Sequence, residues 1–206
     1  LAILQRLQTL GVLRAIHPAL EPGRGAEAAA RRLAEVPTAA GAPGAGARPQ
    51  GWQLWLLALL ADRRPPEVRA ALRRLQPPPR AAAKLLKDAA DFRRLRRALG
   101  RRGTYRPSAV ARLLRAVSPE VATLLAARAD REELRAALAD HLMRGAHLRP
   151  ALAGRDLQAL GIRPGPVYRA ILDTLRDARL DARVRTREDE LALVRRRFHK
   201  AMSNEQ

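Results

Sequence analysis

The chain has 206 residues, enough for one large or two small domains, and 47% of them are apolar, so a hydrophobic core can form. It contains no cysteine, which excludes disulfides and thiolate metal sites. The net charge of +20 favours a polyanionic partner such as a nucleic acid. The longest apolar run, residues 54–61, is too short to span a membrane, and nothing resembles a signal peptide. We therefore expect a cytoplasmic protein with no membrane partner.

The composition predicts an all-α fold. Alanine and leucine dominate and only 3% of the residues are aromatic, so the expected core is Leu and Ala packed between helices. A short amphipathic helix is expected within residues 1–20, with Leu4, Leu7 and Leu10 on its apolar face. A modest helix of Ala, Arg and Glu is expected over 24–36, before Pro37. Residues 38–51 are rich in Gly, Ala and Pro and are predicted to form a flexible loop.

Residues 52–60 are apolar on every side, which is typical of a helix in the middle of a bundle. Trp52 and Trp55 are accordingly expected to pack in the core and not to stack on bases. The next helix is expected to start at Pro65 and to end near Gln76, before a run of three prolines.

The longest helix is predicted over residues 80–101. Apolar residues share one of its faces with a period of 3.6, namely Leu85, Ala89, Phe92, Leu95 and Leu99. The opposite face carries Lys87, Arg94, Arg97 and Arg101, with Arg93 at its edge. Residues 63–106 hold 15 basic and 3 acidic side chains, a net +12 of the total +20. A solvated helix face usually mixes charge signs, so this face is predicted to bind phosphates, with an ordinary wet face as the alternative.

Shorter helices are expected after residue 103. One is predicted over 107–117, and Ser118 followed by Pro119 is typical of the N-cap and first residue of the next. Asp130 and Glu133 have the spacing of a capping box.

Residues 154–180 are predicted to form two helices joined by a tight hairpin. Gly161 occupies a helix C-cap, and Pro164 and Pro166 favour the start of the second helix. Gly165 would let a bulky partner approach the backbone, and free N–H groups at that helix start would bind phosphate. The alternative is a plain hairpin whose glycines only make the turn. Three arginines complete the predicted site: Arg155, Arg163 and Arg169.

Motifs in the second half of the chain resemble, in their order, the C-terminal part of bacterial tRNA nucleotidyltransferases. These enzymes belong to the poly(A) polymerase family and build or repair the CCA end of tRNA. The motifs lie at residues 107–110, 113–114, 118–120, 154–157, 160–166, 178–181 and 190–194, and a looser one at 10–18 resembles the end of the family's neck. The resemblance is good over residues 104–198. It departs at Ala182, where a Gly often follows the Asp, and at Ala153, where Thr is common.

The resemblance implies an elongated protein with the end of a neck in residues 1–20, a helical body in 21–140 and a helical tail in 141–206. It implies a tRNA partner, bound by the backbone of the acceptor and T-arm because every tRNA must be accepted. The catalytic carboxylates of the family lie in an N-terminal head, where the parent enzyme would use Mg²⁺ with CTP or ATP. We expect this chain to lack that head, since it opens within a helical pattern, and to hold no catalytic residue, metal or cofactor.

Two other interpretations stay open from the residues alone. One is a stand-alone helical module that binds nucleic acid, including DNA, through the turn at residues 161–165. The other is a non-catalytic helical scaffold whose arginines reflect a GC-rich genome, because only Lys84, Lys87 and Lys200 are lysines.

Overall fold

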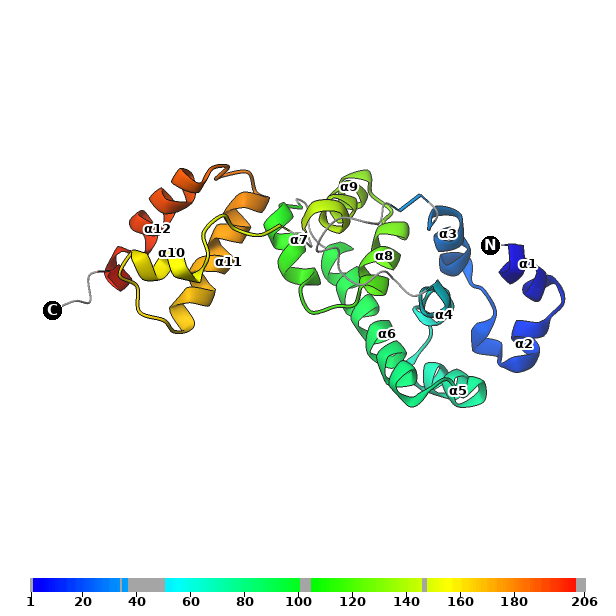
Figure 1. The fold of residues 1–206 in the computed structure, drawn as a ribbon. Helices are drawn as coiled ribbons and strands as arrows, with labels where there is room; N and C mark the ends of the chain where they lie inside the picture. The colour runs from blue at the N-terminus through cyan, green and yellow to red at the C-terminus, as the bar shows by residue number, and fades with distance from the viewer. Residues whose placement is uncertain (1, 34, 37–50, 101–104, 146–147, 203–206) are drawn as a thin grey trace.

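The computed structural model describes residues 2–33, 35–36, 51–100, 105–145 and 148–202. Within these ranges the chain is all-α without any strand, as the sequence predicts, and it is elongated (Figure 1). The α-helices are α1 (Ala2–Thr9), α2 (Val12–Ile16), α3 (Arg24–Arg32), α4 (Gly51–Leu60), α5 (Pro65–Leu75), α6 (Pro79–Gly100), α7 (Pro107–Leu114), α8 (Pro119–Ala127), α9 (Glu132–Asp140), α10 (Gly154–Ala159), α11 (Pro166–Leu180) and α12 (Arg187–Met202). A 3₁₀ turn, η1 (Pro18–Leu20), and a π turn, η2 (His141–Gly145), complete the list.

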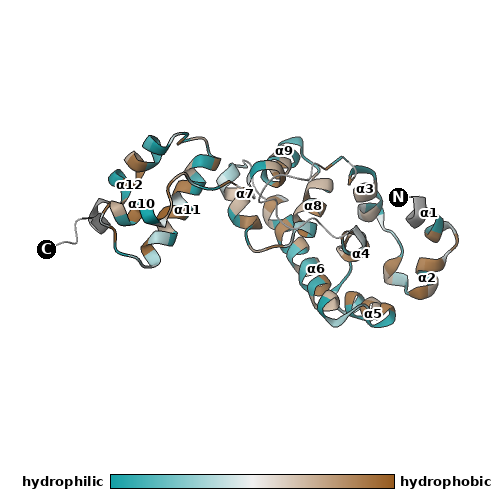
Figure 2. Cartoon of the chain, viewed as in Figure 1, coloured by the Kyte–Doolittle hydropathy of each residue, from teal (hydrophilic) through white to brown (hydrophobic). Residues whose placement is uncertain are grey.

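A first hydrophobic cluster runs from Leu13 to Leu138 and holds α1 to α9 together. Helix α8 lies at its centre, and residues 120–127 are all buried. The predicted apolar face of α6 packs against it, and its five residues are each at most 1% exposed. Because one face of α6 is buried and the other is wet, polar and apolar residues alternate along this helix (Figure 2).

One of the three lysines of the chain joins α6 to α8 inside this cluster. The ammonium of Lys84 lies 2.7 Å from Asp88 and 2.8 Å from Glu120, two carboxylates that are almost fully buried. Burial alone would lower the pKa of Lys84, but the hydrogen bonds to both carboxylates outweigh it and raise that pKa. Lys84 is therefore a structural cation and unavailable to a polyanion.

A second cluster builds the tail from six buried residues: Leu152, Leu157, Ile162, Ile171, Leu175 and Val194. It joins α10, α11 and α12, so the predicted helical hairpin does not stand alone. The carboxylate of Glu190 in α12 is fully buried and accepts hydrogen bonds from the N–H groups of Ala151 and Leu152, at 3.0 and 2.9 Å. It also pairs with Arg179 of α11 at 3.2 Å. Glu190 thus ties three segments of the tail together.

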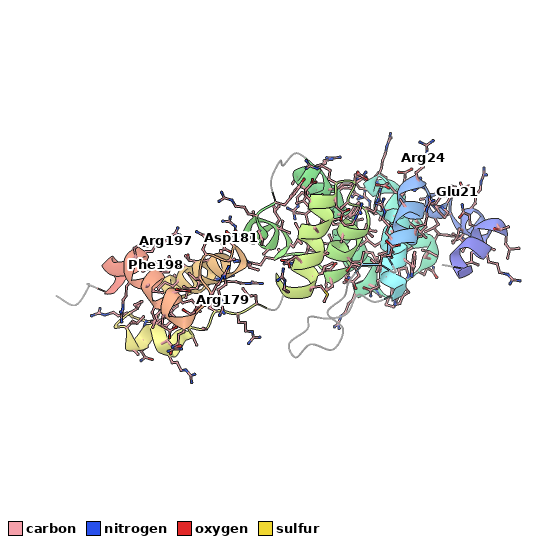
Figure 3. The ribbon with its side chains drawn as sticks, turned by 90° about the horizontal axis from the view of Figure 1, so that it is seen from above. Glu21, Arg24, Arg179, Asp181, Arg197 and Phe198 are labelled. Atoms are coloured by element: carbon pink, nitrogen blue, oxygen red, sulfur yellow. The ribbon has the colours of Figure 1, made fainter. Side chains whose placement is uncertain are left out.

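Helices α7 and α11 join the two clusters. Asp181 accepts hydrogen bonds from the N–H of Ser108 at 3.0 Å and from its hydroxyl at 2.9 Å, although 73 residues separate them. The carboxylate therefore caps the start of α7, where Arg106 provides no side-chain cap. Two arginine–aspartate pairs continue the contact along both helices, Arg112–Asp177 and Arg115–Asp173. Asp181 and Arg179 lie at the end of α11 that faces the body (Figure 3).

Replacing Asp181 by alanine is expected to loosen this joint. Ser108 is only 4% exposed, so its N–H would lose its partner in a buried place, at a cost of about 1–3 kcal/mol. Small-angle scattering should show a wider range of molecular dimensions, and urea unfolding should begin earlier. Asp173→Ala is the control, because its exposed pair with Arg115 contributes little. Equal behaviour of the two variants would contradict a special role of Asp181.

The residue after Asp181 has a strained backbone. Ala182 has φ 55°, while the N–H of Arg183 donates to the Ala178 carbonyl at 2.8 Å, the pattern of a helix C-cap that favours glycine. The conformation of Ala182 is thus one in which the glycine of the resembled family's pattern would be unstrained.

Ala182→Gly should therefore stabilise the tail. The left-handed conformation costs an alanine about 1–2 kcal/mol, and the entropy of glycine offsets about 0.5–1 of this. The free energy of unfolding should rise by about 0.5–1 kcal/mol in urea denaturation, whereas Ala192→Gly inside α12 should lower it. A loss of stability in Ala182→Gly would contradict this account.

Several local predictions were wrong. Trp52 is 50% exposed and Leu10 is 66% exposed, so neither is a core residue. Helix α9 begins at Glu132 and its N-cap is Arg131, which forms no side-chain cap. The predicted capping box of Asp130 and Glu133 is therefore out of register by one residue. Helix α7 ends at Leu114, three residues before the predicted end. The predicted loop at 38–51 lies outside the described residues, apart from Gly51 at the start of α4.

Candidate nucleic-acid interface

The predicted cationic stripe of α6 contains an acidic residue. Lys87 and Arg94 both pair with Asp91, at 2.6 and 3.0 Å. Burial alone would raise the pKa of Asp91, but the hydrogen bonds from the two cations lower it below its ordinary value. The prediction of an unmixed face was therefore wrong at this point. The side chains of Lys87 and Arg94 are still 63% and 59% exposed, and the group of three keeps a net positive charge.

The side chain of Arg93 forms hydrogen bonds within the fold. Its guanidinium donates to the carbonyls of Arg63 and Ala61, at 3.0 and 3.4 Å, and so holds the α4–α5 connection against α6. Burial, together with the nearby charge of Arg97, lowers the pKa of Arg93. Arg97 itself is exposed and forms no ion pair with any residue that the structure describes. Arg101 lies outside the described residues, so its position in the stripe stays a prediction.

Helix α5 adds cations that the periodicity argument missed. Arg69, Arg73 and Arg74 are exposed, and none of them pairs with a residue in the described ranges. Arg80, at the start of α6, is also exposed and has no ion-pair partner among the described residues. The charge count over residues 63–106 already contained this signal, but the face analysis was confined to the longest helix. Since α5 packs against α6, the unpaired cations belong to two neighbouring helices (Figure 1).

The tail hairpin has the predicted turn at Gly161. Its φ of 79° is the left-handed value of a C-cap, and the N–H of Ile162 donates to the Leu157 carbonyl at 3.1 Å. The hydroxyl of Tyr168 donates to the Ile162 carbonyl at 2.7 Å and braces the turn from α11. Gly165 is different, because its backbone is extended and a Cβ there would meet no atom within 4 Å. The space around Gly165 is therefore open. The fold can accept a side chain at this position, and a partner can approach the backbone there.

The three predicted arginines of the tail are all exposed. Arg163 lies in it and Arg169 in the first turn of α11, and neither has an ion-pair partner in the described part of the chain. The start of α10 lies against Tyr168, whose ring would be 3.7 Å from a Cβ at Gly154. Arg155 follows Gly154 in the chain and is also exposed, without an ion-pair partner in the described ranges. Arg163 and Arg169 thus lie at the turn, and Arg155 lies in the first turn of α10.

The acidic run at the start of α12 is structural. Asp189 accepts hydrogen bonds from the N–H groups of Thr186 and Arg185, which hold the pKa of its carboxyl below the usual range. Among the described residues no three His, Asp or Glu side chains come close enough to hold a metal ion. No helix in the described ranges is long and apolar enough to cross a bilayer.

Comparison with known proteins agrees with the motifs. No family model and no solved structure matches the chain. The chain is 35% identical over 98 residues to the A-adding tRNA nucleotidyltransferase of Geobacter sulfurreducens. The match covers 48% of this chain and 11% of that protein, so the chain spans only a small part of the length of this relative. The similarity supports a relation to tRNA nucleotidyltransferases, as the motifs predict, over about half of the chain.

Proposed function

We propose that this chain is the body and tail of a tRNA nucleotidyltransferase and holds tRNA while a catalytic head, outside this sequence, acts on the 3′ end. The observation that carries the proposal is the 35% identity over 98 residues to an A-adding enzyme. The net charge of +20 and the exposed, unpaired arginines of α5, α6 and the hairpin support it.

The contacts would be made mainly to phosphate and sugar. Arginine offers a planar fork of donors that fits phosphate oxygens, and such contacts position an RNA without reading its sequence. A protein that serves every tRNA needs this kind of recognition, with the shape of the acceptor and T-arm as the common feature. In this proposal the body binds through Arg73, Arg97 and their neighbours, and the hairpin through Arg163 and Arg169.

The chemistry of nucleotide addition is assigned to the head. It would require Mg²⁺ held by clustered carboxylates, together with CTP or ATP. The acidic residues of the described ranges do not fit such a site, since Asp88, Glu120 and Glu190 are buried in ion pairs and Asp189 caps a helix. In this proposal the chain binds tRNA and the head carries out catalysis.

Affinities for tRNA, a blunt RNA hairpin and duplex DNA, measured at one fixed salt concentration, test the proposal. Tightest binding to tRNA is expected. Equal affinity for duplex DNA would favour a general nucleic-acid-binding module, and the absence of binding to all three would favour a scaffold.

A further inference from the structure

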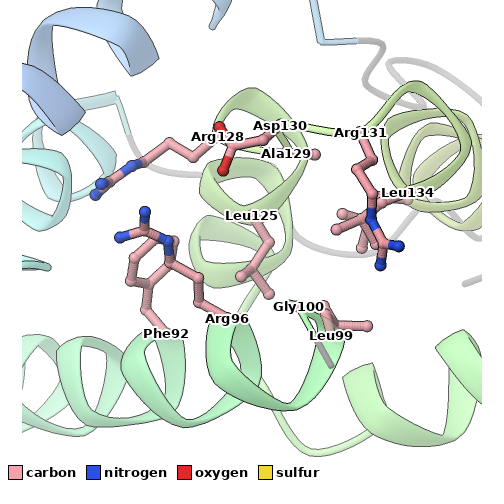
Figure 4. A pocket seen from close by; sticks show the side chains of 11 residues that line it. Phe92, Arg96, Leu99, Gly100, Leu125, Arg128, Ala129, Asp130, Arg131 and Leu134 are labelled. Atoms are coloured by element: carbon pink, nitrogen blue, oxygen red, sulfur yellow. The ribbon is translucent and has the colours of Figure 1, made fainter. Parts of the chain in front are cut away.

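A pocket of about 310 Å³ lies between α6, the end of α8 and the start of α9. Its volume is at the lower end of the range of about 300–1,000 Å³ that is typical of small-ligand sites. The walls include Leu99, Leu125 and Leu134, and three arginines lie around them (Figure 4). The four arginines named above as tRNA contacts do not line this pocket, namely Arg73, Arg97, Arg163 and Arg169.

The arginines are held in fixed positions. Arg128 is 9% exposed, its guanidinium lies 5.1 Å from the centre of the Phe92 ring, and its Nη2 is 2.8 Å from Asp62. The Asp62 carboxylate also pairs with Nη1 of Arg96, at 3.2 Å. Nη1 of Arg128 is buried and has no hydrogen-bond partner among the described residues, which is a costly state for a charged group. One carboxylate therefore serves two guanidinium groups. Asp130 also lines this end of the pocket, so the net positive charge of the lining comes from Arg131.

The other end of the pocket is cationic. The guanidinium of Arg131 lies 5.0 Å from the centre of the Tyr105 ring, a contact that orients its plane. Figure 4 shows Arg96 and Arg128 at one side of the view, Arg131 at the other, and Leu125 and Leu99 between them. An apolar centre between cations suits a ligand with a flat apolar part and a negative charge.

We propose that this pocket takes one unpaired nucleotide of the bound RNA, with its base on the leucines and a phosphate near Arg96 or Arg131. The inference rests on the proposed function. Base faces stack on apolar and guanidinium surfaces, whereas a base inside a duplex exposes neither face. Arg96 is also adjacent to Arg97, and successive residues of a helix differ by about 100° in direction. A strand that follows Arg97 on the outer face of α6 can therefore turn one base inward past Arg96.

The ligand is a nucleoside phosphate, and it could come from RNA or from a free nucleotide. The experiment measures the affinity of the whole chain for a blunt RNA duplex, for the same duplex with a short single-stranded adenosine extension, and for AMP. The variants are Arg131→Gln and Arg96→Gln, with Arg97→Gln as the matched control, since Arg97 is exposed and does not line the pocket. Circular dichroism verifies that each variant is folded.

The wild-type chain should bind the extended duplex roughly tenfold more tightly than the blunt one, the effect of one stacked base. Arg131→Gln and Arg96→Gln should lose most of this ratio, whereas Arg97→Gln should weaken both affinities and keep the ratio. Equal binding of both duplexes by the wild type would overturn the inference and leave the proposed function intact. Saturable AMP binding without a preference for the extension would overturn the assignment to RNA. If neither duplex binds, the proposed function fails and the inference fails with it.

Discussion

Replacing Glu190 by alanine is expected to unfold the tail or to destabilise it by about 3–5 kcal/mol, the usual cost of breaking a buried ion pair. The Glu190 carboxylate is fully buried and accepts from the Ala151 and Leu152 N–H groups and from Arg179. Its removal leaves these donors without partners and Arg179 without its charge partner.

Hydrogen exchange measures this effect locally. The amides of Ala151 and Leu152 should exchange much faster in Glu190→Ala, and urea unfolding should show an early transition. Glu188→Ala is the matched control, because Glu188 lies two residues away in the same helix turn and is exposed. Unchanged protection of both amides in Glu190→Ala would show that the carboxylate does not hold the tail together.

Reversing the charge of Arg97 and Arg169 together should weaken tRNA binding by about one to two orders of magnitude at low salt. Both side chains are exposed and unpaired in the described structure, so their replacement by glutamate breaks no ion pair within the fold. Each lost phosphate contact should make the negative slope of log affinity against log salt less steep by about 0.7–0.9. The effect should be the same for tRNAs of different sequence, since the contacts are made to the backbone.

The matched control reverses Arg6 and Arg31, which are also exposed and lie in α1 and α3, helices that pack against α2, α4 and α8. It changes the net charge of the chain by the same amount. Filter binding or fluorescence anisotropy at several salt concentrations gives both quantities. An equal loss of affinity in the two double variants would mean that net charge alone attracts tRNA and that no defined face exists.

The helices could be predicted from sequence where apolar periodicity is long or where proline and glycine mark the ends. Helix α6 shows the first case, because five apolar residues in one register bury together. The turn at Gly161 shows the second. Trp52 shows the limit of composition, because an apolar helix in a bundle can still expose one side of its first turn. No local pattern distinguishes that side.

Contacts between distant residues could not be predicted. Asp181 and Ser108 both stand in recognised motifs, yet nothing in either motif indicates that the aspartate caps a helix 73 residues earlier. The candidate site shows the same limit. The count of basic residues located the charged region, but which arginines are free depends on partners such as Asp91 and the Arg63 carbonyl. Such partners are set by the packing of α4, α5 and α6.

The absence of cysteine allows a direct test of the central claim that α6 and the hairpin contact tRNA. A single cysteine can be placed at Ala90, which is exposed on α6 one turn before Arg94, or at Gly165, where a Cβ meets no atom within 4 Å. Each carries a photo-activated cross-linker. The control position is Ala136, which is exposed on α9 and lines a different hollow of the surface, formed with Arg32 and Val36. Cross-linking to tRNA is predicted from positions 90 and 165 and not from 136. Failure at both 90 and 165, or equal yield from 136, would contradict the account.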